Sequence, residues 1–203
     1  MIQKGGDYLL VHTFGVSIFL VFSFINEGMA QALITITSHI LGAKIKNTYY
    51  KKLIRTSIMF LTGTMILLLI PLLGMQNFLI GLFIKDPLSP QSTALLKESC
   101  VCIWVICLAS GVNRIGTSLN TAARDTLYHA LWNSIFWITL CIPVYLGIGK
   151  YGWTPPKFFL IDAFSSILVG TILILRFLRE SFKKRSFYPI RLENESRLPS
   201  PNL

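Results

Sequence analysis

The stretch FINEGMAQALITITSHILGA, residues 24–43, places a carboxylate inside an otherwise apolar run of the chain. Glu27 is followed by three more polar residues, at spacings of four, four and three: Gln31, Thr35 and Ser38. On a helix, these spacings put all four side chains on one face. A segment this apolar is predicted to lie in lipid, where an ionised carboxylate that faces hydrocarbon costs ~2.5 kcal/mol or more. We therefore expect this face to turn toward other helices or a water-filled cavity.

The composition of the whole chain is typical of a membrane protein. Of its 203 residues, 53% are hydrophobic and 14% are charged, whereas soluble domains carry about 25% charged residues. The apolar residues form blocks near or above the ~20 residues that cross a bilayer. These blocks lie at about 9–41, 54–84, 94–120, 127–148 and 158–178. We therefore predict an all-α integral membrane protein with about five transmembrane helices, folded as one domain over residues 1–185.

The distribution of charge indicates the topology. The formal net charge is +10, and the basic residues lie between the apolar blocks. They do not form a stripe interleaved with exposed aromatic residues, so we expect no nucleic-acid partner. By the positive-inside rule, fourteen of the 19 Lys and Arg residues, Arg114 among them, mark the cytoplasmic side. This count predicts a multi-pass protein of the cell (inner) membrane, embedded in the lipid bilayer, with a polar, disordered cytoplasmic tail at residues 186–203.

Two other apolar blocks carry polar or small residues at helical spacing. Block 94–120 has four of them: Ser110, Asn113, Thr117 and Asn120. Block 158–178 has three, each four residues apart: Asp162, Ser166 and Gly170. Lys157 lies close enough in the sequence to pair with Asp162. Small and hydroxyl residues of this kind also serve close helix packing, in which each interhelical hydrogen bond contributes about 0.6 kcal/mol, so packing remains an alternative for them.

Together, these polar faces predict a hydrophilic cavity between the first, third and fifth apolar blocks. Glu27 and Asp162 are the candidate cation- or proton-binding acids, because an intramembrane carboxylate is expensive to retain for packing alone. The candidate cavity-lining residues are Gln31, Asn113 and Thr117. No arginine is expected deep in any helix. An acid in such a cavity can exchange a proton or bind Na⁺, which would couple an ion gradient to the movement of a substrate.

Motifs of other functional classes are missing from the sequence. No glycine-rich phosphate-binding loop occurs, and the three histidines have no matched acid, Ser or Cys, so we expect neither ATP-driven transport nor enzyme activity. The four cysteines lie inside apolar blocks without metal-ligand spacing and are expected to be small buried hydrophobes. We expect no metal site and no cofactor, with Na⁺ or H⁺ acting only as the coupling ion.

Four stretches resemble motifs of the multidrug and toxic compound extrusion (MATE) transporters. ITSHILGAK resembles the signature that ends the second helix of each half, LFIKDP resembles an outer loop, and YLLVHTFGVSIFLVF is similar to the start of helix eight. LNTAARDTLYHALWNSIFWITLCIPVYLG resembles a segment that carries a GDT motif, an asparagine and a proline. The matching residues are Asp125, Thr126, Asn133 and Pro143, with Arg124 where a glycine is usual.

The resemblance covers about residues 8–185 and implies both a fold and a function. MATE transporters have twelve helices in two six-helix lobes, and they couple drug efflux to the entry of Na⁺ or H⁺. This chain would be helices eight to twelve, an incomplete C-terminal lobe that exports small organic, often cationic compounds. Alternating access needs two lobes that rock around a shared site, so a second chain would supply the missing N-terminal lobe. Glu27 corresponds to no known ligand residue of the family. Its candidate role as a cation- or proton-binding acid therefore comes from its position in an apolar helix and not from the resemblance.

Other interpretations stay open at this point. The chain could be a truncated remnant without transport, or a non-transporting membrane subunit that binds a partner through an exposed small-residue face such as Ser166 to Gly170. Within transport, a lipid-linked sugar flippase is the alternative, although it would want a more cationic central cavity. The identity of the substrate and the choice between Na⁺ and H⁺ are also left open by the sequence.

Overall fold

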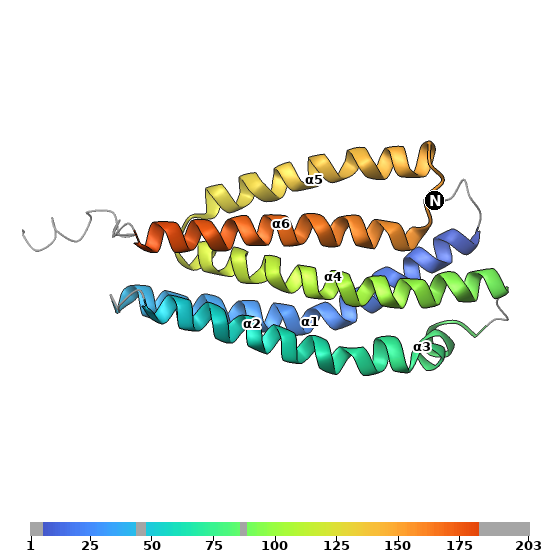
Figure 1. Ribbon diagram of the computed structural model, residues 1–203, viewed down its shortest axis with the longest axis horizontal. Helices are drawn as coiled ribbons and strands as arrows, with labels where there is room; N and C mark the ends of the chain where they lie inside the picture. Colours follow the sequence, from blue (N-terminus) through green and yellow to red (C-terminus); the bar gives the residue numbers. More distant parts are fainter. Residues whose placement is uncertain (1–5, 44–47, 86–88, 183–203) are drawn as a thin grey trace, which may run out of the picture.

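The computed structural model describes residues 6–43, 48–85 and 89–182, and the predicted cytoplasmic tail lies outside these ranges. In the described ranges the chain is helical and has no strand (Figure 1). The elements are α1 (Gly6–Gly42), α2 (Thr48–Leu69), the π-helical turn η2 (Ile70–Gly74), α3 (Gln76–Phe83), α4 (Pro90–Ala122), α5 (Thr126–Gly149) and α6 (Pro155–Phe182).

Five helical stretches are long and apolar enough to cross a membrane, judged by length and composition. They are Tyr8–Gly42, Tyr49–Gly74, Pro90–Ala122, Thr126–Gly147 and Pro155–Ser181. The long helices run roughly side by side (Figure 1), and a helix satisfies its own backbone hydrogen bonds, as lipid requires. The prediction of an all-helical chain with five such helices is confirmed, and it indicates a multi-pass membrane protein.

The second predicted helix, 54–84, is interrupted. It consists of α2, η2 and the short α3, with Pro71 inside η2. Proline has no N–H to donate, and its ring clashes with the carbonyl four residues earlier, so the helix widens locally. The N–H of Met75 donates to the carbonyl of Ile70, five residues back, at 3.0 Å. The sequence therefore predicts where this segment ends but misses the break within it.

α4 is the central helix of the bundle. It lies between α6 and α1 (Figure 1), and 50% of its most apolar window is buried, against 12% for α5. Glycines allow α4 and α6 to approach closely: a Cβ added to Gly170 would lie 2.7 Å from the backbone of Asn113, and one added to Gly116 would lie 2.7 Å from the carbonyl oxygen of Gly170. Ser166 is also buried. The predicted exposed face from Ser166 to Gly170 is therefore wrong, because α4 packs on Gly170 and Ser166 is buried.

Two buried asparagines tie α4 to its neighbours. Asn26 on α1 donates from Nδ2 to the carbonyl oxygen of Cys107 on α4 at 2.8 Å. Asn120 on α4 donates from Nδ2 to the carbonyl oxygens of Gly116 at 2.8 Å and of Leu173, on α6, at 2.9 Å. Asn26 is 2% exposed and Asn120 is 1% exposed. Asn120, which belongs to the polar face predicted for block 94–120, is thus a structural residue of the α4–α6 contact.

α4 ends in a Schellman motif centred on Arg124. The N–H of Asp125 donates to the carbonyl oxygen of Asn120 at 2.9 Å, and the N–H of Arg124 donates to the carbonyl oxygen of Thr121 at 3.0 Å. Arg124 has a φ of 60°, the left-handed conformation that glycine adopts freely and that costs other residues about 1 kcal/mol or more. The position therefore favours glycine, although the chain has arginine there.

Replacing Arg124 with glycine is expected to stabilise the protein by about 1 kcal/mol, because the substitution removes left-handed strain. The thermal midpoint in detergent, followed by circular dichroism, should rise by roughly 2–4 °C. Arg179→Gly is the matched control, since Arg179 is exposed in the last turn of the right-handed α6. There, glycine should lower the midpoint, and a decrease in both variants would contradict the strain at Arg124.

Arg176 on α6 holds the α4–α5 turn. Its Nη2 and Nε lie 2.7 Å and 2.8 Å from Oδ2 of Asp125. Its guanidinium carbon lies 3.6 Å from the centre of the Tyr128 ring, at the start of α5. Because such a doubly bonded arginine fixes both distance and direction, Arg176 joins the turn and the first part of α5 to α6.

Candidate functional site: a polar cavity between four helices

A cavity of about 570 Å³ opens between α1, α4, α5 and α6, a size typical of small-molecule sites. All five predicted site residues line it: Glu27 and Gln31 from α1, Asn113 and Thr117 from α4, and Asp162 from α6. The blocks that were predicted to enclose a cavity correspond to α1, α4 and α6. The structure thus brings the predicted residues together, while their roles stay predictions.

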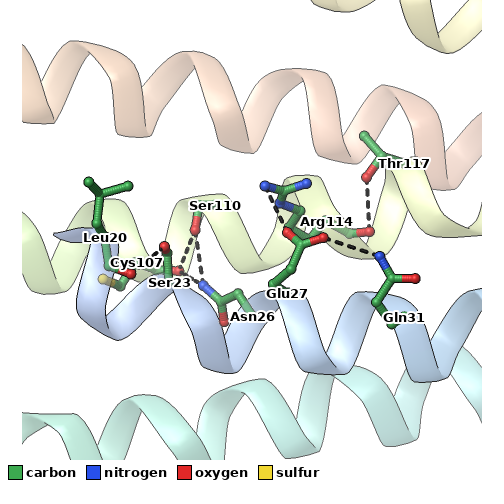
Figure 2. Close-up of polar contacts among 9 residues, drawn as sticks. All are labelled: Leu20, Ser23, Asn26, Glu27, Gln31, Cys107, Ser110, Arg114 and Thr117. Carbon is green, nitrogen blue, oxygen red and sulfur yellow. Dashed lines mark hydrogen bonds and ion pairs between the residues drawn. The ribbon is translucent and has the colours of Figure 1, made fainter.

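Glu27 faces Arg114 across the contact between α1 and α4 (Figure 2). Its Oε2 lies 2.9 Å from Nη2 of Arg114, and its Oε1 accepts a hydrogen bond from Nε2 of Gln31 at 3.3 Å. The side chains of Glu27 and Arg114 are 41% and 52% exposed, so the ion pair lies at the open side of the cavity. The negative charge of Glu27 is therefore already balanced by a neighbouring helix.

Arg114 is a further charged residue of the cavity, although the sequence counted it with the basic residues of the cytoplasmic side and not among the candidate cavity residues. It lies within the apolar span Pro90–Ala122, about two turns before α4 ends, and it lines the cavity. Its position four residues after Ser110 continues the polar face of this helix. The same spacing that identified Asn113 and Thr117 therefore contained the signal for Arg114.

Asp162 is the second acid of the cavity. Its Oδ1 accepts a hydrogen bond from the hydroxyl of Ser166 at 3.4 Å. In the described part of the chain no ion pair joins it to Lys157, so the pair that the sequence allows does not form. Five residues apart on one helix, the two side chains point in directions that differ by about 140°. With both acids ionised and His129 neutral, the lining of the cavity carries one uncompensated negative charge, at Asp162.

The cavity also contains an unpaired acceptor and a contribution from α5. The Oδ1 atom of Asn113 is buried and has no hydrogen-bond partner within the described ranges, a situation that a donor from water or from a ligand would relieve. The sequence-based cavity lacked α5, which contributes four polar or aromatic side chains to the lining: His129, Asn133, Phe136 and Trp137. His129, Asn133 and Trp137 are spaced four residues apart, so helical spacing contained a signal for this face that the sequence-based prediction did not use.

Parts of the predicted polar faces do not reach the cavity. Thr35 and Ser38 are exposed, and the Thr35 hydroxyl donates to a carbonyl of its own helix, four residues back, at 3.1 Å. Thr117, which does line the cavity, donates in the same local way to the carbonyl of Arg114 at 3.1 Å. The expectation that the whole face of residues 24–43 turns inward is therefore wrong, because threonine and serine can satisfy themselves on their own helix.

The described residues give no support for a metal site or for a disulfide. Within residues 6–43, 48–85 and 89–182, no group of three or more His, Cys, Asp or Glu could hold a metal ion. The cysteines are free, with Cys100, Cys102 and Cys107 buried and Cys141 exposed. The expectation of burial is thus confirmed for the three cysteines on α4. It is wrong for Cys141, because the helix that carries it, α5, packs least.

No protein family, no curated protein and no solved structure matches the chain. The cavity is therefore interpreted from its own chemistry. It combines an ion pair, a carboxylate without a basic partner among the described residues, and an unpaired amide oxygen, all between apolar helices. Such a set can bind a small cation and can exchange a proton at the carboxylate.

Proposed function

We propose that the chain forms one lobe of a secondary transporter that exports small organic cations, and that this lobe resembles the C-terminal lobe of MATE transporters. The observation that carries the proposal is that Asp162 lines a cavity of about 570 Å³ between apolar helices and has no basic partner among the described residues, so its ionised form would carry an uncompensated negative charge. A cation is attracted more strongly to such a carboxylate than in water, because the surroundings have a lower dielectric constant. Trp137 adds an aromatic surface to the same cavity, and cations also favour aromatic faces.

The turn after α4 supports the MATE-like interpretation. The family motif has a glycine where this chain has Arg124, and Arg124 adopts a φ of 60°, which favours glycine. The aspartate of the same motif, Asp125, binds Arg176 at 2.7 Å. In a protein with a related backbone, glycine at the position of Arg124 and aspartate at the position of Asp125 would therefore be favoured for the same structural reasons.

We assign different roles to the two acids. Asp162 binds the exported cation and, in exchange, the coupling ion, which is Na⁺ or H⁺. Because one carboxylate cannot hold both at once, their competition would couple efflux to ion entry. Glu27 retains Arg114 as its partner, and the path of the substrate is lined by three polar residues: Gln31, Asn113 and Thr117.

A complete transport cycle needs a second lobe, since alternating access arises when two lobes rock around a shared site. We propose that a partner chain supplies this lobe across the open side of the cavity, where Glu27 and Arg114 are exposed. The surplus of basic residues in one set of loops supports a cytoplasmic C-terminus in the cell (inner) membrane.

The two alternative functions have less support. A lipid-linked sugar flippase would need a cationic cavity for its pyrophosphate, but Glu27 already neutralises Arg114. A subunit that docks through the small residues from Ser166 to Gly170 would need that face to be free, but α4 packs on it. Both observations therefore favour a cation transporter over these alternatives.

Asp162→Asn is expected to weaken ethidium binding by about tenfold or more, because the substitution removes the uncompensated charge that attracts a cation. The measurement is fluorescence titration of the purified chain in lipid nanodiscs, with empty nanodiscs subtracted. Glu98→Gln is the matched control, since Glu98 is an exposed acid of α4 that does not line the cavity. Equal affinity in the wild type and in Asp162→Asn would overturn the assignment.

Export is tested separately from binding. Ethidium accumulation is measured in a pump-deficient host that expresses the wild-type chain, Asp162→Asn or Glu98→Gln. A transporter lowers accumulation with the wild type and Glu98→Gln but not with Asp162→Asn. Binding without any protection of the host would instead support a lobe that requires its partner, or a non-transporting remnant.

A further inference from the structure

Arg114 determines how much negative charge the cavity presents. The titratable side chains that line the cavity are two acids, Glu27 and Asp162, one arginine, Arg114, and one histidine, His129. Because Arg114 lies 2.9 Å from Glu27, only the charge of Asp162 is left for a ligand. Without Arg114 the same lining would offer two negative charges, and without Glu27 it would offer none in excess.

The ion pair is not needed to hold α1 against α4. Both partners are about half exposed at the open side of the cavity, and an ion pair that water can reach contributes little to stability. α1 and α4 are already joined by Asn26 and by the buried apolar core that they share. Charged groups within a spanning segment are costly and usually mark a pathway for a substrate or an ion, so the placement of Arg114 points to the cavity.

We propose that Arg114 is a specificity-determining residue, an internal cation that restricts the cavity to organic cations with a single positive charge. This inference rests on the proposed function and deepens it by naming the substrate class. The first charge of a ligand would pair with Asp162. A second positive charge would find Glu27 already occupied and would meet the guanidinium of Arg114, so it would lose its hydration without gaining a partner.

Two dyes with the same ring system test this inference. Ethidium carries one positive charge, and propidium carries a second one on a quaternary ammonium side chain. With the chain in nanodiscs, we expect the wild type to prefer ethidium. Arg114→Gln frees Glu27, and the ratio of propidium affinity to ethidium affinity should rise by about tenfold, the order expected for one additional charge in a partly solvated cavity.

Three further variants separate charge from structure. Arg114→Lys keeps the charge and should keep the wild-type ratio of the two affinities. Glu27→Gln leaves the guanidinium unpaired, so both dyes should bind more weakly, propidium more than ethidium. The double variant Glu27→Gln, Arg114→Gln restores one excess negative charge and should restore the wild-type ratio. A purely structural role would weaken both dyes equally and would not be rescued in the double variant.

The outcomes distinguish this inference from the proposed function. If Asp162→Asn binds ethidium as the wild type does, the proposed function fails. If Asp162→Asn loses ethidium binding while Arg114→Gln leaves the affinity ratio of the two dyes unchanged, the cavity binds cations but Arg114 does not select them by charge. Only the second result overturns the inference by itself.

Discussion

Gly170→Leu is expected to lower the thermal midpoint of the protein in detergent by on the order of 10 °C, because even a Cβ at this position would lie 2.7 Å from the backbone N and Cα of Asn113. Backbone atoms of a buried helix cannot move aside as a flexible side chain can. α4 and α6 would have to separate, at a cost of about 3 kcal/mol for overpacking and lost contacts. Each kcal/mol shifts the midpoint by roughly 2–4 °C in a chain of this size.

Gly63→Leu is the matched control for this prediction. Gly63 lies on α2, and a Cβ added there meets no atom within 4 Å, so leucine should change the midpoint little. Gly170→Leu should also weaken ethidium binding, since Asp162 is carried by the displaced helix. Equal midpoints for the two leucine variants would contradict the close contact between α4 and α6.

The long helices can be predicted from the sequence, but their ends and breaks depend on single residues. Uninterrupted apolar length determines a membrane-spanning helix, because lipid leaves the backbone no other partner. Hydropathy places the start of the third helix at about 94, yet α4 starts at Pro90, where Ser89 Oγ accepts the N–H of Ser92 at 3.1 Å. A hydropathy window averages over many residues, so it does not detect this single capping hydrogen bond and misplaces the start of the helix.

Helical spacing could predict which side chains share a face and that the first, third and fifth apolar blocks enclose a cavity, but not that α5 also lines it or that Glu27 pairs with Arg114. The face of Glu27 and Gln31 was identified in this way, as were Asn113 and Thr117, and all four line the cavity. Whether an acid such as Glu27 has a basic partner depends on which residue of a neighbouring helix lies at the same level, as Arg114 of α4 does. Counting Arg114 with the cytoplasmic loops followed the positive-inside rule, which treats arginines near helix ends as boundary residues.

The two acids of the cavity differ in one long-range contact, the ion pair that joins Glu27 on α1 to Arg114 on α4. From the sequence, Glu27 is the leading candidate for a cation-binding acid and Asp162 is the second. The ion pair at 2.9 Å between Glu27 and Arg114 reverses this order, and it moves the expected binding site to Asp162. The same central helix, α4, supplies the base that neutralises Glu27 and the surfaces that hold α1 and α6 in place.

Asn120→Asp is expected to destabilise the protein by about 3–5 kcal/mol, although the two side chains have nearly the same shape. Asn120 is 1% exposed, and its Nδ2 donates to the carbonyl oxygens of Gly116 at 2.8 Å and Leu173 at 2.9 Å. A carboxylate would turn an acceptor toward both carbonyls and bury an uncompensated charge. The thermal midpoint should fall by about 10 °C or more.

Asn77→Asp makes the same chemical change at an exposed position. Asn77 lies in the first turn of α3, where a negative charge is favoured by the helix dipole, so its midpoint should be unchanged or slightly higher. Asn120→Asp and Gly170→Leu both act on the contact between α4 and α6, and their effects combined should be smaller than the sum of the two. Full additivity would mean that the asparagine and the glycine stabilise separate parts of the fold, contrary to the bond that joins Asn120 to Leu173.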